Sequence, residues 1–181
     1  PSAVAKQFRE EKDELFLNHP QSALDNDQKS RFKGLSYFAY DPAYVFEAEI
    51  TEVPPRAVTV QKNAYESMTM TSVAQVTFAI KNQAATLSIY WLELYGGGLF
   101  LPFHDATSPE ISYGAGRYLF DTIKGSNFLE SMKNGKRTII LDFNYAYNPS
   151  CAYNKAWVCP LAPVENRIEP AIEAGEKNFT L

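Results

Sequence analysis

Histidine and cysteine are scarce in this sequence, with two of each in 181 residues. A chain of this length can bury one substantial core without disulfides. Catalytic zinc sites commonly take at least two His or Cys ligands, whereas His19 falls at the end of a predicted helix, far along the chain from His104. We therefore expect a fold that needs neither a metal nor another cofactor.

Basic residues are also too few to favour a nucleic acid as partner. The 17 Lys and Arg residues are outnumbered by 21 Asp and Glu residues, and they form no basic run. Proteins that bind the phosphate backbone gather positive charge on one face. The longest apolar window, residues 87–101, is interrupted by Ser88, Glu93 and a glycine triplet, so it cannot cross a bilayer. These patterns predict a soluble protein that binds neither nucleic acid nor membrane.

The start of the sequence lacks the apolar core and cleavage site of a secretory signal. It runs from Pro-Ser-Ala-Val-Ala-Lys directly into a charged helical pattern. A cytoplasmic protein that has lost its initiator methionine explains this start, although a processed mature chain would begin in the same way. We expect a cytoplasmic location.

Aromatic residues are abundant, at 14% of the chain, and they favour β-structure. We expect residues 1–181 to form a single domain in three parts. Residues 1–34 are a helical lead-in, residues 44–148 a β-meander, and residues 149–181 a proline-rich C-terminal wrap. The sequence therefore predicts a mainly β fold, an antiparallel β-barrel or a curled β-sandwich, with one or two N-terminal helices.

The lead-in has the pattern of one helix followed by a shorter one. Ser2 suits the N-cap of the first helix, which should end at His19-Pro20, and residues 9–13 should mostly face solvent. Asp25 or Asn26 can cap the second helix, with Gly34 as its left-handed stop. The apolar members of the first helix, near helical spacing, are Val4, Phe8, Leu15 and Phe16.

The meander shows alternating apolar residues between turn signals. Residues 74, 76, 78 and 80 alternate with polar neighbours, and residues 86–94 can return antiparallel after a tight turn at Lys81-Asn82-Gln83. Residues 99–103, 113–120 and 138–147 are predicted to continue the sheet. The other turn signals are Asp41-Pro42, Pro54-Pro55, Gly96-Gly97-Gly98, Ser108-Pro109, Gly125-Ser126-Asn127 and Asn134-Gly135.

Two polar, aromatic-rich stretches, residues 103–118 and 142–153, form the candidate site. In a strand over residues 113–120, Tyr113 and Arg117 share one face. In a strand over residues 138–148, Asp142 and Asn144 share one face. The density of carboxylates, amides, phenols and an arginine exceeds what a solvated surface needs.

Our leading hypothesis is a pocket centred on Arg117 that binds a small anionic or polar-aromatic ligand. The other ligand-binding candidates are Tyr113, Asn144, Tyr147 and Asn148. The alternative is that Arg117 pairs internally with Asp105, Glu110 or Asp142 and only fixes the register of the fold.

An enzyme is the second hypothesis, with the pocket carboxylates as general acid or base in a hydrolase, lyase or isomerase. The candidates are Asp105, Glu110, Asp142 and His104. The three carboxylates also suit a Mg²⁺ or Ca²⁺ site, but a turn held by Asp105, Thr and Ser side chains explains this stretch more simply. A third hypothesis is a structural or interaction protein without a ligand.

Cys151 and Cys159 flank a short loop between two prolines. Their spacing is not that of a CxxC motif, so the redox or zinc signal is weak. They can close a ring in an oxidising compartment, and they are expected to be thiols in the cytosol. Cys151 as a nucleophile would need a base, and His104 is the only candidate.

Seven ordered blocks of the chain resemble the domain-of-unknown-function family numbered 1684, over almost the whole length. That family has no established activity, so the resemblance implies no reaction. Where the family pattern has Arg or Lys before Asp105 this chain has His104, which weakens a scheme with an obligatory histidine base. Where the pattern has Gly after Thr-Ser, this chain has Pro109. The blocks start at Arg9, Phe32, Leu99, Tyr113, Leu141, Cys159 and Ala174.

The positions that match the motifs of the family carry no assigned role. The identity of the ligand, the formation of a homodimer and the redox state of the two cysteines are left open by the residues. The matching positions are Asp105, Thr107, Ser108, Glu110, Tyr113, Gly116, Arg117, Asp142, Asn144, Tyr147, Asn148, Cys151, Cys159, Glu165, Asn166 and Glu176.

Overall fold

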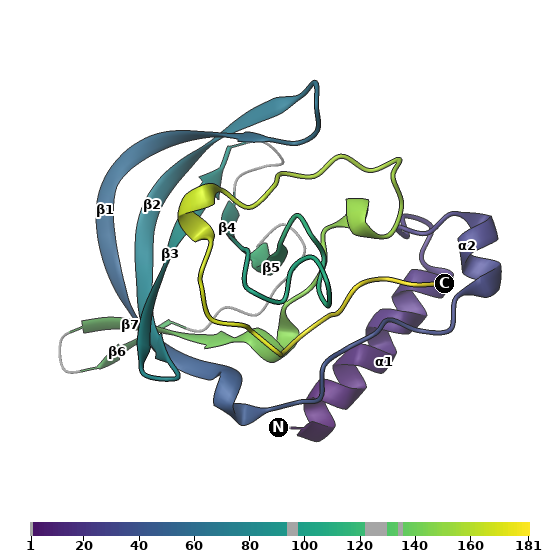
Figure 1. The fold of residues 1–181 in the computed structure, drawn as a ribbon, viewed down its shortest axis with the longest axis horizontal. Helices are drawn as coiled ribbons and strands as arrows, with labels where there is room; N and C mark the ends of the chain where they lie inside the picture. The colour runs from purple at the N-terminus through teal and green to yellow at the C-terminus, as the bar shows by residue number, and fades with distance from the viewer. Residues whose placement is uncertain (1, 94–97, 122–129, 134–135) are drawn as a thin grey trace.

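The computed structural model describes residues 2–93, 98–121, 130–133 and 136–181. These residues form a curled antiparallel sheet of seven strands, in the order β5-β4-β3-β2-β1-β7-β6, preceded by two helices (Figure 1). The predicted fold class is thus confirmed, in the form of a half-barrel. The elements are α1 (Ser2–Asn18), α2 (Asn26–Arg31), β1 (Val45–Gln61), β2 (Ser67–Ile80), β3 (Gln83–Leu92), β4 (Gly98–Phe103), β5 (Arg117–Asp121), β6 (Glu130–Lys133), β7 (Lys136–Asp142) and the short 3₁₀ helices η1 (Pro42–Tyr44), η4 (Phe143–Tyr145), η5 (Ser150–Ala152) and η6 (Val164–Asn166).

The tight turn between β2 and β3 has the predicted chemistry. Lys81 and Asn82 both have positive φ angles, 48° and 64°. A two-residue hairpin loop of this kind matches the right-handed twist of the strands that it joins. The turns predicted at Gly96-Gly97-Gly98, residues 125–127 and Asn134-Gly135 lie outside the described residues, except for Gly98, which begins β4.

The sheet buries one face near one end of its long strands and the opposite face near their other end. In β3, Leu87 and Ile89 belong to one core cluster, whereas Tyr90 and Leu92 belong to another. Successive side chains of a strand point to opposite faces, so the two clusters lie on opposite sides of the sheet. The change coincides with bulges in β2, between Ser72 and Ala74, and in β1, between Glu52 and Arg56. A bulge puts extra residues opposite one partner and so changes the side that a strand buries.

The C-terminal segment, residues 160–176, has little regular structure and lies against the sheet (Figure 1). The side chain of Asn166 accepts a bond from the Ser88 amide and donates to the carbonyls of Ser88 and Pro102. Ser88 lies in β3 and Pro102 in β4, beyond the paired part of these strands. One amide side chain therefore joins the backbones of two strands where their ladder has ended.

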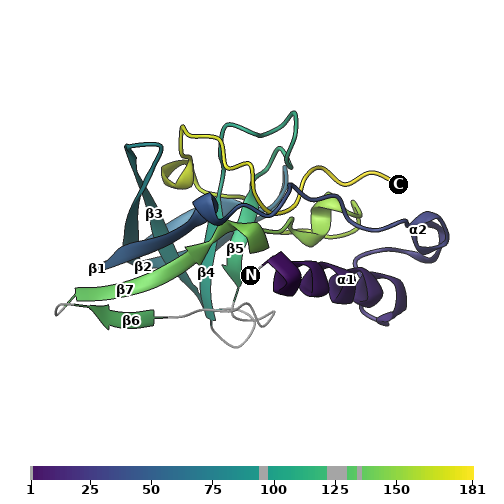
Figure 2. The same cartoon turned by 90° about the horizontal axis from the view of Figure 1, so that it is seen from below.

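The prediction that the charged residues of helix α1 mostly face solvent is wrong for Lys12. The helix spans Ser2–Asn18, as expected, and lies beside one end of the sheet (Figure 2). Its residues Val4 and Leu15 are largely exposed, while Ala5 is buried. Lys12 reaches inward to Glu176, instead of facing solvent. The face of α1 that packs against the rest of the protein thus contains both apolar and cationic residues. The spacing of apolar residues in the sequence does not reveal the cationic ones.

Two predicted strands are shorter than expected. β5 begins at Arg117, because residues 113–116 form a turn in which Gly116 has φ +92°. A Cβ on Gly116 would lie 2.5 Å from the carbonyl oxygen of Phe103, so only glycine fits. β7 ends at Asp142, whose side chain accepts a bond from the Asn144 amide and caps η4. The alternation argument therefore does not apply to residues 113–116 or 143–148.

We predict that Asn166→Ala lowers the free energy of unfolding by about 3 kcal/mol, because it leaves buried backbone groups of Ser88 and Pro102 without partners. Urea denaturation followed by circular dichroism measures the loss. The control is Asn18→Ala, which removes an exposed bond to Glu14 within α1. Equal stabilities of the two variants would contradict the bridging role of Asn166.

Candidate functional site

Arg117 is fully buried at the start of β5. Its Nη1 donates to the carbonyl oxygens of Ala174 and Glu176, at 2.5 and 3.0 Å. Its Nη2 donates to the carbonyl of Ile172 at 2.8 Å and to Oδ1 of Asp105 at 3.0 Å. Both terminal nitrogens of the guanidinium are therefore engaged inside the protein, mostly by the C-terminal segment.

Asp105 completes this network from the other side. Its Oδ2 accepts bonds from the Ile172 amide at 2.7 Å and from the Thr107 hydroxyl at 2.9 Å. Burial lowers the pKa of Arg117, and the charge of Asp105 opposes that shift. A buried charge needs such a partner, since its solvation by water is lost. The geometry is that of the internal ion pair, the alternative to a ligand-facing arginine, and the Asp105-Thr107 bonds form the expected turn.

Asp142 and Asn144 are in contact, as predicted, although not through strand alternation. Oδ1 of Asp142 accepts bonds from the backbone amide and the side-chain amide of Asn144, at 3.0 and 2.9 Å. Asn144 also exchanges bonds with the backbone of Asp41. This pair fixes the chain before η1 against the end of β7, and it does not contact Arg117.

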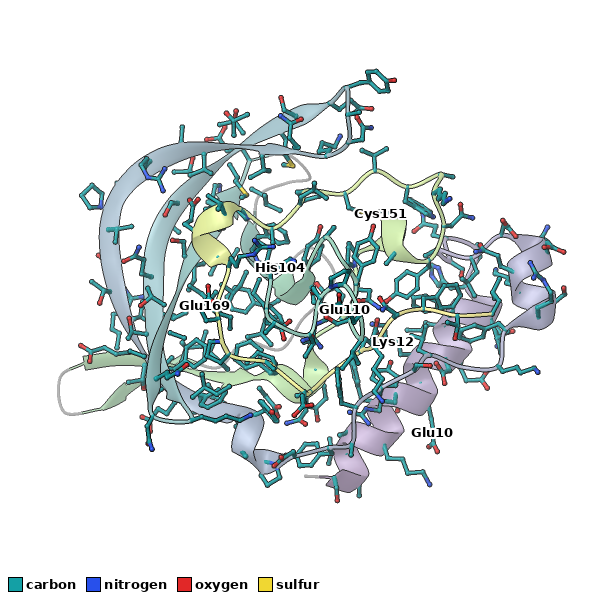
Figure 3. The ribbon with its side chains drawn as sticks, in the orientation of Figure 1. Glu10, Lys12, His104, Glu110, Cys151 and Glu169 are labelled. Atoms are coloured by element: carbon teal, nitrogen blue, oxygen red, sulfur yellow. The ribbon has the colours of Figure 1, made fainter. Side chains whose placement is uncertain are left out.

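A third network surrounds Glu176, which is buried. Its carboxylate accepts bonds from Lys12 at 2.5 Å, from the Asn148 amide at 3.0 Å and from the Tyr153 hydroxyl. The ammonium of Lys12 lies 4.8 Å from the ring centroid of Tyr147. Figure 3 shows Lys12 pointing from α1 into the body of the protein. Sequence reasoning missed Lys12, although it lies four residues from both Phe8 and Phe16 on the helix.

Asp13 lies next to this network and is partly buried. Its Oδ1 accepts a bond from the Leu35 amide at 2.9 Å. Burial raises the pKa of Asp13, and the nearby charge of Glu176 raises it further. The absence of a Cβ on Gly34 leaves room for this carboxylate.

The remaining candidates, His104, Glu110 and Tyr113, belong to one loop, residues 104–116, but the side chains of His104 and Tyr113 bond to different partners. His104 accepts a bond from Arg167, and burial lowers its pKa. Glu110 is exposed, and Figure 3 shows His104 well apart from Cys151. Tyr113 donates to the sulfur of Cys151 at 3.6 Å. The described part of the chain holds no group of three or more metal-ligating side chains.

The residues proposed as one site thus divide into three networks, and those of Arg117 and Asn148 meet at Glu176, whose carbonyl accepts a bond from Arg117. Asp105 joins Arg117, Asp142 joins Asn144, and Asn148 joins Glu176. Each network connects chain segments that are distant in sequence.

A groove lies elsewhere, beside the bulges of β1 and β2, and has a volume of about 350 Å³. Its lining includes Ile50, Val73 and Leu99, which are partly buried and pack against the larger core cluster. Arg137 and Glu52, an exposed ion pair, contribute the charged part of the lining. The groove residues are Ile50, Glu52, Val53, Pro55, Val73, Ala74, Ile89, Leu99 and Arg137. Sequence analysis did not find this groove, because its residues come from five strands.

Comparison with known proteins gives a family and a structural relative. Residues 30–177 match the family described as "Protein of unknown function (DUF1684)". The chain belongs to this family. An uncharacterized protein of Haloarcula marismortui, known from its solution NMR structure, is 32% identical, with a TM-score of 0.67 over 97% of this chain and 92% of that one. No curated protein matches.

The resemblance inferred from the sequence blocks is therefore confirmed, and so is the absence of an assigned activity in the family. Within the described residues, no helix has the length and apolar character needed to span a membrane.

We predict that Arg117→Ala lowers the free energy of unfolding by about 4 kcal/mol, because the charge of Asp105 stays buried without its partner. Arg31→Ala, which breaks an exposed pair with Asp27, should cost less than about 0.5 kcal/mol. Thermal and urea unfolding measure both. Wild-type stability of Arg117→Ala would restore the hypothesis that this arginine serves a ligand.

We predict that Asp13→Asn stabilises the protein at pH 7. A carboxyl whose pKa is raised by folding contributes full stability below its unfolded pKa, and this contribution is lost as the pH rises through the folded pKa. The asparagine keeps the acceptor for Leu35 without the charge. The gain should vanish near pH ~3, where aspartate is protonated in both states.

Urea unfolding at both pH values measures this difference. Glu11→Gln, an exposed change in the same helix, is the matched control and should give no gain. A gain in Asp13→Asn that persists at low pH would rule out the ionisation of Asp13 as its cause.

Proposed function

We propose that the protein binds a small molecule with an apolar body and one anionic group, in the groove beside the bulges of β1 and β2. The observation that carries the proposal is the combination of a volume of about 350 Å³, an apolar lining and a cation in that lining. The volume lies at the lower end of the range for small-molecule sites.

The apolar part of the lining supplies the affinity in this proposal. Ile50, Val73 and Leu99 stay partly exposed although they pack against the core. A ligand that covers them removes apolar surface from water, at about 25 cal/mol per Å². A molecule of roughly twenty heavy atoms fits this volume better than a large cofactor.

Arg137 supplies the selectivity for an anion. Its partner Glu52 is largely exposed, so their ion pair contributes at most about 1 kcal/mol. An anionic ligand group can take the place of Glu52 in this ion pair, and a guanidinium binds carboxylate or phosphate oxygens in a forked geometry. Glu52 then returns to water.

This proposal keeps the class of ligand predicted from the sequence, but it assigns the anion-binding role to Arg137 instead of Arg117. Both terminal nitrogens of the buried Arg117 donate to groups of the protein, and the side-chain amides of Asn144 and Asn148 donate to backbone carbonyls. Of these side chains, only Arg117 Nε and Asn148 Oδ1 are buried without a partner among the described residues. The enzyme hypothesis has no comparable support, because Asp105 and Asp142 hold internal bonds. Glu110 is exposed.

We predict that the protein binds 1-anilinonaphthalene-8-sulfonate with enhanced fluorescence, and that Arg137→Gln weakens this binding about fivefold, the equivalent of one exposed ion pair. Val73→Trp should abolish binding by filling the groove. N-phenyl-1-naphthylamine, the same ring system without the sulfonate, should bind wild type and Arg137→Gln equally.

Arg56→Gln is the matched control, since Arg56 is also exposed and paired, with Glu165, but does not line the groove. It should leave the affinity for both probes unchanged. Near-ultraviolet circular dichroism confirms that each variant is folded. Failure of the sulfonate to bind wild type, or equal weakening by Arg56→Gln and Arg137→Gln, would refute the proposal.

A further inference from the structure

Cys151 and Cys159 lie side by side although eight positions separate them in sequence. The backbone amide of Cys151 donates to the sulfur of Cys159 at 3.4 Å. Since an amide nitrogen is one bond from its Cα, the Cys159 sulfur already lies at the start of the Cys151 side chain. A disulfide needs Cα atoms about 4.4–6.8 Å apart, and this approach is compatible with that range.

The two sulfurs differ in access and in partners. Cys159 is buried, whereas Cys151 is partly accessible. The Tyr113 hydroxyl donates to the Cys151 sulfur at 3.6 Å. The pKa of Cys151 is raised, first because its side chain shares a hydrogen bond with Cys159 and second by burial, while the Tyr113 bond opposes this. Tyr113 is thus placed to stabilise the thiolate that disulfide exchange requires.

We propose that Cys151 and Cys159 are a reversible dithiol–disulfide site that is oxidised by a small organic disulfide, with Cys151 as the first sulfur to react. The Cys151 thiolate attacks the S–S bond of oxidised glutathione, forms a mixed disulfide and releases one glutathione thiolate. The Cys159 thiolate then attacks the Cys151 sulfur and releases the second. The two cysteine protons pass to the two glutathione thiolates, so two thiols are oxidised and one disulfide is reduced.

The new bond would close a ring over residues 151–159, which contacts two other parts of the fold. Tyr153 in this ring bonds to Glu176, and the indole nitrogen of Trp157 donates to the carbonyl of Ala23. A cross-link here removes freedom from the unfolded chain, so the oxidised protein should melt on the order of 5 °C higher. Oxidation would therefore cross-link a segment that contacts both the helical lead-in and the C-terminal chain.

The test is a titration of the native 181-residue chain with mixtures of reduced and oxidised glutathione, quenched in acid and read by intact mass. We expect a monomer lighter by two hydrogen atoms, with Cys151 and Cys159 in one cross-linked peptide. The same titration in urea should need about tenfold more oxidising conditions, because only the folded chain holds the sulfurs together. Equal midpoints, retained thiols, a stable mixed disulfide or a cross-linked dimer would each overturn the proposal.

Single variants test the order of reaction. Cys159→Ser should stop at a glutathione adduct on Cys151, whereas Cys151→Ser should stay unmodified while folded, because Cys159 is buried. Tyr113→Phe should slow the first exchange without moving the equilibrium midpoint. An adduct that forms on Cys159 as fast as on Cys151 would overturn the assignment of Cys151 as the first sulfur.

Discussion

The fold depends on the ion pair between Arg117 and Asp105, because this pair holds the C-terminal segment against the sheet. The segment has few backbone partners of its own, and three of its carbonyl groups, those of Ile172, Ala174 and Glu176, accept bonds from the one guanidinium. Buried carbonyl groups need donors, and an irregular chain cannot supply them through a ladder. The arginine therefore supplies the hydrogen-bond donors that a neighbouring strand would otherwise supply to this segment.

Side chains also bond to backbone groups that lack a strand partner at other places along the chain. Asn166 joins β3 and β4 where their ladder ends, and Asn148 donates to the carbonyl of Lys177. Asn144 connects the end of β7 with Asp41. The polar, aromatic-rich stretches are explained by this need for side-chain donors and acceptors, since much of the chain outside the seven strands is irregular. A high density of amides and carboxylates thus marks irregular buried backbone as readily as a ligand site.

The sequence predicted the parts of the fold that follow a local rule. Alternation from Ala74 to Ile80 and the turn at Lys81-Asn82 identified the β2–β3 hairpin, because period and turn type depend on neighbouring residues only. The same reasoning failed at residues 113–116, where a glycine fits against the backbone of Phe103. It also failed for Lys12, whose inward direction depends on Glu176, a residue 164 positions away.

The candidate site was harder to predict for a related reason. The amino acids Arg, Asn and Asp can serve a ligand or distant backbone equally well, and only the tertiary fold decides which. The groove was hidden because it arises from the two bulges, which move the buried side of β1 and β2 from one face to the other. Where the core changes sides, Ile50 and Val73 pack against the larger core cluster but are only partly buried. The bulges therefore cause both the division of the core and the groove, so a change that straightened β2 at Ser72–Ala74 would alter the groove without touching the Arg117 network.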